Sequence, residues 1–208
     1  MTSKLYSFGE SGNCYKVALM LELCGIEWQQ VFVDGFKGGS RTEDFAGLNP
    51  MKEVPVLVHH GKRYAQSGVM LDVLSRETGR FGPASEDDRL EIFRWTLWDN
   101  HKLSSQIGTL RYQMNFLPAE RRSQPVINFL IGRCHTALNI LESHLYGRDW
   151  IAADAATTAD LSCCGYLYYP EEFGFSRSDY PGIDAWLSRI SALPGWKNPY
   201  DLMERALK

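Results

Sequence analysis

In the first 80 residues the pattern of hydrophobic and polar positions changes between that of a strand and that of a helix. Residues 4–8 have the composition of a strand, and the apolar positions from Val17 to Cys24 follow helical spacing. Gly25 then stops the helix, and residues 26–33 alternate as a second strand. Because a strand–helix–strand crossover is right-handed, the two strands are predicted to lie parallel.

The pattern changes after this unit. It predicts a short helix over residues 40–47, a hairpin of residues 56–58 and 63–65, and a helix over residues 67–78. The element order of this α/β N-terminal domain is therefore βαβαββα.

No strand pattern follows, so the second half is predicted to be an all-α helical domain. Helical runs are predicted at residues 86–116, 122–146, 157–169, 181–192 and 195–207. The polar, glycine-containing stretch between the halves reads as a linker. We therefore predict a first domain over residues 1–79, a linker over 80–87 and a second domain over 88–208.

Thr157 and Asp160 have the spacing of a capping box in front of an apolar run. In that motif the two side chains each satisfy a backbone N–H group at the start of a helix. This pair is predicted to act in folding, not in chemistry.

Charge and composition narrow the function classes. The chain has 208 residues and a formal net charge of −3, with acidic and basic residues interspersed. This balance argues against a nucleic-acid partner. No apolar run approaches the roughly 18 residues of a membrane span, and no signal sequence opens the chain, so we expect no membrane association and a cytoplasmic location.

Cysteine and histidine usage predicts no metal site. Five cysteines without framework spacing suit a reducing compartment better than a disulfide scaffold. His59 and His60 are adjacent, and on a strand their side chains would point to opposite faces. They are therefore predicted not to chelate one ion.

Val54-Pro55 and Gln66-Ser67 together predict a site for a short acidic peptide. A proline at this position belongs at the start of a strand or on an edge, with a cis peptide bond as one possibility. The N–H and C=O groups of Val54 then stay free to pair with an extended ligand. Gln66 and Ser67 enter a helix, whose N-terminus favours a carboxylate.

The element order, Glu53-Val54-Pro55, Gln66-Ser67 and the capping box together resemble the cytosolic glutathione transferases over essentially the whole chain. The resemblance implies a thioredoxin-like first domain with a cis proline and glutathione as cosubstrate. It implies that Val54 and Pro55 hold the cysteinyl unit of glutathione and that Gln66 and Ser67 hold its γ-glutamyl end. Lys52 occupies the position of a group that meets the glycyl carboxylate, with a solvated loop lysine as the alternative.

Two residues compete for the thiol chemistry. Ser11-Gly12-Asn13-Cys14 resembles the Ser-x-x-Cys pattern of theta- and delta-like transferases, which implies that Ser11 stabilises the glutathione thiolate and that Asn13 gives a second donor. Cys14 has the spacing of the second cysteine in a thioredoxin motif, so mixed-disulfide chemistry is the rival.

The resemblance implies an enzyme that conjugates glutathione to an apolar small-molecule electrophile. A glutathione-dependent peroxidase or disulfide reductase and a non-catalytic glutathione-binding carrier remain alternatives. The electrophile site is expected where the first domain faces the long helix, with Arg111, Tyr112, Met114 and Phe116 as candidate residues. The resemblance also implies a homodimer, in which Asp99 would reach the partner's glutathione.

Overall fold

The computed structural model describes residues 2–207 and divides into two compact units. The first unit contains the residues up to Gly82 together with those from Leu193 onward, and the second contains Pro83–Ala192. The main segment of the first unit ends at Gly82, within the stretch predicted as a linker over residues 80–87. Residues 193–207, which were predicted to belong to the helical domain, are instead part of the first unit.

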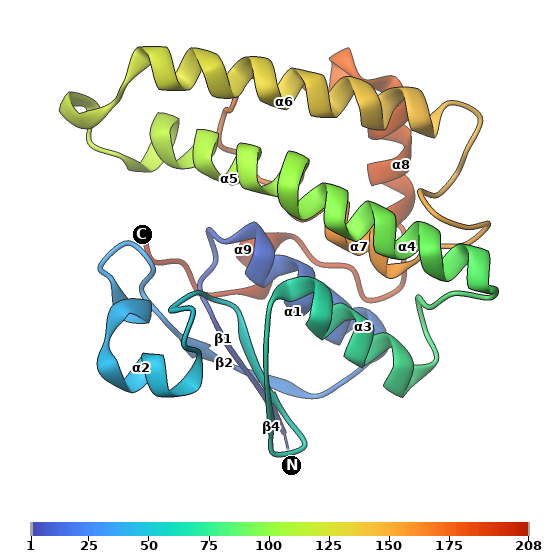
Figure 1. The fold of residues 1–208 in the computed structure, drawn as a ribbon, viewed down its shortest axis with the longest axis horizontal. Coiled ribbons are helices and arrows are strands. Elements are labelled where there is room, and N and C mark those ends of the chain that lie inside the picture. Colours follow the sequence, from blue (N-terminus) through green and yellow to red (C-terminus); the bar gives the residue numbers. More distant parts are fainter. Residues whose placement is uncertain (1, 208) are drawn as a thin grey trace. The chain divides into compact units, whose positions relative to one another are not determined.

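A four-stranded mixed sheet in the order β2-β1-β3-β4 forms the centre of the first unit (Figure 1). Its strands are β1 (Ser3–Ser7), β2 (Trp28–Phe32), β3 (Val56–His59) and β4 (Lys62–Ala65). β1 and β2 are parallel, whereas β3 is antiparallel to both β1 and β4. This is the thioredoxin-like arrangement that the resemblance implied.

Successive side chains of a strand point to opposite faces of the sheet, and both faces carry apolar residues. Helices therefore cover the sheet. The helices are α1 (Gly12–Cys24), α2 (Glu43–Leu48) and α3 (Ser67–Thr78), with a 3₁₀ turn, η1 (Gly39–Arg41), before α2. Tyr6 and Val56 are paired across β1 and β3 and pack in one cluster with Phe45 of α2. The next pair, Leu5 and Leu57, is fully buried and points to the opposite face.

The chain end completes the first unit along α1. The Tyr15 hydroxyl donates to the Lys197 carbonyl at 2.9 Å, and the Lys197 ammonium lies 2.7 Å from the Glu22 carboxylate. A helix predicted over 195–207 is wrong in extent, because only α9 (Pro199–Leu202) is helical and Met203 is already extended. The tail after α9 forms hydrogen bonds with the β1–α1 loop. These bonds satisfy backbone groups of the tail that would otherwise pair within a helix.

The second unit is helical throughout its described secondary structure. Its long run over residues 86–116 is continuous, as predicted, but two π-helical turns interrupt the α-helical pattern. The elements are α4 (Glu86–Trp98), η2 (Asp99–Leu103), α5 (Ser104–Arg111), η3 (Tyr112–Phe116), η4 (Ala119–Arg121), α6 (Gln124–Leu145), α7 (Thr158–Cys163), η5 (Arg177–Asp179) and α8 (Pro181–Ser191). None of the helices in residues 2–207 combines the length and apolar content that crossing a membrane needs.

The capping box predicted at Thr157 is confirmed. Thr157 is the N-cap of α7, and its N–H donates to Asp160 Oδ2 at 2.8 Å. Asp160 is fully buried and also accepts from the Ile151 N–H and the Trp186 Nε1–H, each at 2.9 Å. Burial raises the pKa of the Asp160 carboxyl, and these donors oppose that rise. The motif therefore joins three segments of the second unit.

Candidate functional site

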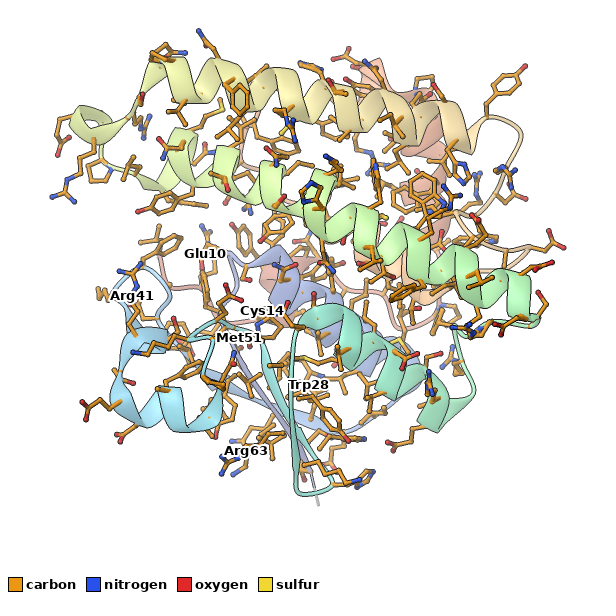
Figure 2. The ribbon with its side chains drawn as sticks, in the orientation of Figure 1. Glu10, Cys14, Trp28, Arg41, Met51 and Arg63 are labelled. Atoms are coloured by element: carbon orange, nitrogen blue, oxygen red, sulfur yellow. The ribbon has the colours of Figure 1, made fainter. Side chains whose placement is uncertain are left out.

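The sheet register brings the predicted binding residues of the first unit to one end of the sheet. Val56 pairs with Tyr6 of β1 and with Ala65 of β4. Pro55 therefore lies beside the end of β1, and Gln66 follows directly from the end of β4. Figure 2 shows Glu10 and Met51 toward this end of the sheet, and Trp28 and Arg63 toward the other.

The segment before β3 presents an unpaired backbone. The Val54–Pro55 peptide bond is cis, as the resemblance implied. Within residues 2–207 the N–H and C=O groups of Val54 make no hydrogen bond. The Val54 side chain packs against the α2-facing cluster of the sheet, so this unpaired backbone is held in place. Both groups are free to pair with an extended peptide.

A second group of polar atoms lies at the start of α3. Gln66 is the N-cap and has φ 69°, while its side-chain amide donates to Glu53 Oε2 at 3.3 Å. Ser67 is the first residue of α3, and it is buried. Among the described residues the N–H groups of Ser67 and Gly68 have no acceptor. Such a helix start attracts a carboxylate.

Lys52 and Glu53 extend this surface. Lys52 is exposed and has φ 56°, a backbone conformation that non-glycine residues adopt rarely. The Asn49 side chain fixes the turn by donating to the Glu53 carbonyl at 2.8 Å. The loop thus holds one cation and one anion next to the free backbone of Val54.

Ser11 stands at the N-terminus of α1. Its hydroxyl oxygen accepts from the Cys14 N–H at 3.3 Å, and its carbonyl accepts from the Tyr15 N–H at 3.0 Å. The residue is 8% exposed, and its side chain also forms a hydrogen bond with the Cys14 thiol, which lowers the pKa of that thiol. Its hydroxyl can donate a hydrogen bond to a ligand by rotating its proton away from the Cys14 sulfur, while its oxygen still accepts from the Cys14 N–H.

Cys14 does not have the environment of a reactive thiol. It is fully buried, and this burial raises the pKa of the thiol to about 12 against the lowering effect of the Ser11 hydrogen bond. A thiol with this pKa stays protonated at neutral pH, and only the thiolate attacks a disulfide. The structure therefore argues against the mixed-disulfide hypothesis for Cys14.

Asn13 lies between these two residues and is half-buried. Its Oδ1 atom is buried and has no hydrogen-bond partner among the described residues. Because rotating an amide by 180° exchanges its donor and acceptor, either end of Asn13 can face a ligand. An unsatisfied polar atom at this position is consistent with the predicted binding role.

The loop that carries Ser11 is anchored by residues that the sequence analysis missed. The Glu10 carboxylate accepts from the N–H groups of Ala206 and Leu207 at 2.9 and 3.0 Å, and the Gly9 N–H donates to the Glu204 carbonyl at 2.7 Å. A side chain at Gly9 would meet the carbonyls of Met203 and Glu204 at 3.1 Å. Almost 200 residues separate these partners, so no local pattern could have revealed them.

The candidates at the end of the long helical run differ in exposure. Arg111 is buried and its guanidinium lies 2.6 Å from the Glu171 carboxylate and 3.9 Å from the Tyr169 ring centroid. Tyr112 is exposed, whereas Met114 and Phe116 are partly exposed. Arg111 is thus part of the second unit's core, and the other three remain accessible.

Asp99 cannot serve the role that the resemblance implied. Its carboxylate is fully buried and accepts hydrogen bonds from the Ser104 and Ser162 hydroxyls at 2.7 and 2.6 Å. A buried side chain that bridges η2 and α7 does not reach a partner subunit. The expectation failed because the π-helical turn that begins at Asp99 directs this residue inward.

The prediction that the His59 and His60 side chains point to opposite faces is also wrong. His60 lies in the β3–β4 turn with φ 49° and does not continue the strand. The two imidazole centroids are 4.1 Å apart, and both rings contact Glu77. The alternation rule holds only while both residues are extended.

Two protein-family models match the chain. Residues 10–77 match the glutathione S-transferase N-terminal domain, and residues 105–194 match the glutathione S-transferase C-terminal domain. The chain is 33% identical to a possible glutathione S-transferase from Rhodopseudomonas palustris, with a TM-score of 0.88 over 96% of this chain and 98% of that structure.

Two further relatives differ in their described activities. Protein LigF from Sphingobium sp. is 26% identical over 99% of this chain and 95% of its own length. Its crystal structure, described as that of a beta-etherase, matches with a TM-score of 0.82. The disulfide-bond oxidoreductase YfcG from Escherichia coli is 21% identical over 90% of this chain and 89% of its length.

Proposed function

This chain belongs to the glutathione S-transferase family, and from that premise we propose that it binds glutathione and joins it through its sulfur to an apolar electrophile. Ser11 is the proposed catalytic residue. The proposed glutathione-binding residues are Asn13, Lys52, Val54, Pro55, Gln66 and Ser67. The single observation that carries the proposal is the unpaired Val54 backbone at the same end of the sheet as the Ser11 hydroxyl and the free N–H groups of α3.

The charges and donors at this end suit the three parts of glutathione. The Val54 N–H and C=O pair with the cysteinyl backbone as an added strand would. The Ser67 hydroxyl and the first N–H groups of α3 receive the γ-glutamyl carboxylate, and Glu53 next to Gln66 offers an anion for its ammonium. Lys52 meets the glycyl carboxylate as an exposed point charge.

Ser11 supplies the chemical activation. A free thiol with a pKa of about 8.5 is only about 3% ionised at pH 7, and the thiolate is the nucleophile. The Ser11 O–H donates to the sulfur and stabilises its negative charge, while the thiol proton passes to solvent. The sulfur then forms a bond to the electrophilic carbon, and the leaving group departs with the electron pair of the broken bond.

The relatives support two classes of acceptor. The similarity to LigF, described as a beta-etherase, favours an ether carbon, at which sulfur attack breaks the C–O bond and releases an alkoxide or aryloxide. The similarity to YfcG favours a disulfide, at which the same glutathione thiolate attacks sulfur and releases a thiolate. Because Cys14 is buried, the second reaction would also depend on bound glutathione and Ser11.

A substrate panel tests the proposal. Glutathione binding is measured by calorimetry, and turnover is measured with a chloro-aromatic compound, a β-aryl ether, a hydroperoxide and a mixed disulfide. We expect carbon-centred substrates to be turned over and Ser11→Ala to abolish most of that activity, whereas Ser105→Ala on an exposed helical position leaves it unchanged. Glutathione binding without turnover of any substrate would point instead to a carrier, and absence of binding would contradict the proposal.

We also infer a homodimer, supported by an exposed apolar stripe on α4. Leu90, Phe93 and Leu97 lie at helical spacing on one face and are 51%, 58% and 54% exposed. Sedimentation analysis is expected to give the mass of two chains for the wild type. Phe93→Glu is expected to shift the protein toward the mass of one chain, because a charge on this stripe opposes burial. A monomeric wild type would refute the inference.

A further inference from the structure

His59, His60 and Glu77 form a cluster at the turn end of the β3–β4 hairpin, opposite to the end that carries Val54. The side chains come from the end of β3, the turn itself and the last turns of α3. Their potential ligand atoms all lie within 4.8 Å of one another. In the proposed glutathione-binding mechanism none of these residues has a role.

We propose that this cluster binds a divalent transition-metal ion of the Zn²⁺ type through His59 Nε2, His60 Nε2 and the Glu77 carboxylate. Two imidazole nitrogens and one carboxylate oxygen are ligands that Zn²⁺ prefers, and water completes four-coordination. The site is separate from the glutathione site and does not depend on the proposed function.

The spacing of the ligand atoms suits this assignment. His59 Nε2 lies 2.7 Å from Glu77 Oε2, and His60 Nε2 lies 2.9 Å from Glu77 Oε1. In a tetrahedral site with bonds of about 2.0–2.1 Å, ligand atoms lie roughly 3.3 Å apart. In these two contacts a shift of about half an ångström separates the hydrogen-bonded distance from the coordinating one, and all the potential ligand atoms lie within 4.8 Å of one another. The ion would replace the two N–H protons that the imidazoles now donate to Glu77.

A buried hydrogen bond holds His59 in the orientation that coordination requires. His59 is 3% exposed, and its Nδ1 lies 2.7 Å from the hydroxyl oxygen of Ser3, which is also buried. With the metal on Nε2, the proton resides on Nδ1 and is donated to Ser3. Metal-bound histidines commonly donate their second ring N–H to such a partner, which fixes the ring.

The hairpin turn holds His60 against its neighbour. His60 and Gly61 both have positive φ, at 49° and 76°, as in the two-residue turns that suit the twist of a hairpin. Asparagine is more usual at the first of these positions, but this turn places a second imidazole next to His59. The turn is fixed by pairing of His59 with Lys62, so the ligands are carried by rigid elements.

Charge and access also favour a cation. The two Glu77 carboxylate oxygens contact the two imidazole nitrogens and supply an acidic ligand to the cluster. The side chains of His60 and Glu77 are 62% and 39% exposed, which gives an ion direct entry from solvent. Arg76, next to Glu77 in the sequence, is paired with Asp72 at 2.9 Å.

Titration of the untagged, metal-free protein with Zn²⁺ tests the site. Glutathione is left out because its thiol also binds metals. Calorimetry measures affinity and stoichiometry, Co²⁺ absorption reports coordination geometry, and melting temperature reports preferential binding to the folded state. We expect one ion per chain, a raised melting temperature and weaker binding on acidification, because imidazole ligands must be unprotonated.

Three variants make the test specific. His60→Ala and Glu77→Gln each remove a ligand at an exposed position and are expected to weaken binding by about tenfold or more. His101→Ala removes an exposed histidine of the second unit and is expected to bind as the wild type does. Circular dichroism checks that each variant is folded. No binding by the wild type, or equal binding by His60→Ala, would overturn the proposal and would leave the glutathione site untouched.

Discussion

At the scale of single residues, Ser11 and Cys14 show how burial separates two groups that the sequence left in competition. Both belong to the first turn of α1 and are joined by a hydrogen bond. The sequence supplied their spacing but not their exposure, which depends on packing from distant parts of the chain. The structure leaves the Ser11 hydroxyl able to donate, and it encloses Cys14 completely. The choice between two mechanisms therefore rests on desolvation.

The burial of Cys14 predicts how the thiol reacts with a labelling reagent and how its contribution to stability depends on pH. Iodoacetamide is expected to leave Cys14 unmodified at pH 8 in the native protein and to modify it once the protein unfolds. The pKa is raised from 9.0 to about 12 in the folded state, so the buried thiol favours folding fully below pH 9 and loses this contribution as the pH rises toward 12. Trypsin cleaves after Lys16, so mass spectrometry separates Cys14 from Cys24. Rapid native labelling of Cys14 would contradict the burial argument.

At the scale of elements, residue spacing was most informative where the interactions are local. The strands, α1, α3 and the capping box of α7 follow patterns within a few residues and lie close to their predicted positions. The errors concern elements that distant contacts decide. Residues 203–207 pair with the β1–α1 loop and do not form a helix, and a π-helical turn buries Asp99. His60 was misjudged because a turn replaced the assumed strand.

The capping box gives a prediction for stability. Thr157→Ala removes the hydroxyl that accepts from the Ala159 N–H and donates to Asp160 Oδ2 at 3.0 Å. We expect the free energy of unfolding to fall by about 0.5–2 kcal/mol, with glutathione affinity per folded molecule unchanged. Thr136→Ala on the exposed side of α6 is the matched control and should have little effect. Urea denaturation measures both variants, and equal stability would contradict the cap assignment.

At the scale of the whole molecule, the first unit is built from both ends of the chain. Residues from Leu193 onward contact α1 through Lys197 and contact the Ser11 loop through the 203–207 tail. The family resemblance gave the overall fold, and it indicated the end of the sheet at which we propose that glutathione binds. It did not reveal this discontinuity, since the contacts join residues that share no sequence motif.

Truncation tests the importance of the chain end. A chain that ends at Ala192 loses the Lys197 contacts and exposes the surfaces now covered by Pro199 and Met203, both of which are buried. We expect it to be destabilised by about 3 kcal/mol or more and to lose glutathione binding. A chain that ends at Leu202 keeps α9 and loses only the tail. Its stability should therefore lie between that of the full chain and that of the chain ending at Ala192. Thermal unfolding that is unchanged in the shorter chain would refute this account.

The central claim is that Ser11 stabilises the thiolate of bound glutathione. Its most direct test is the ultraviolet absorbance of that thiolate, titrated against pH in complexes with the wild type, Ser11→Ala and Cys14→Ala. The account predicts a thiol pKa below that of free glutathione in the wild type and Cys14→Ala complexes, and a return toward the free value in Ser11→Ala. An unchanged thiol pKa in Ser11→Ala, or a change confined to Cys14→Ala, would contradict it.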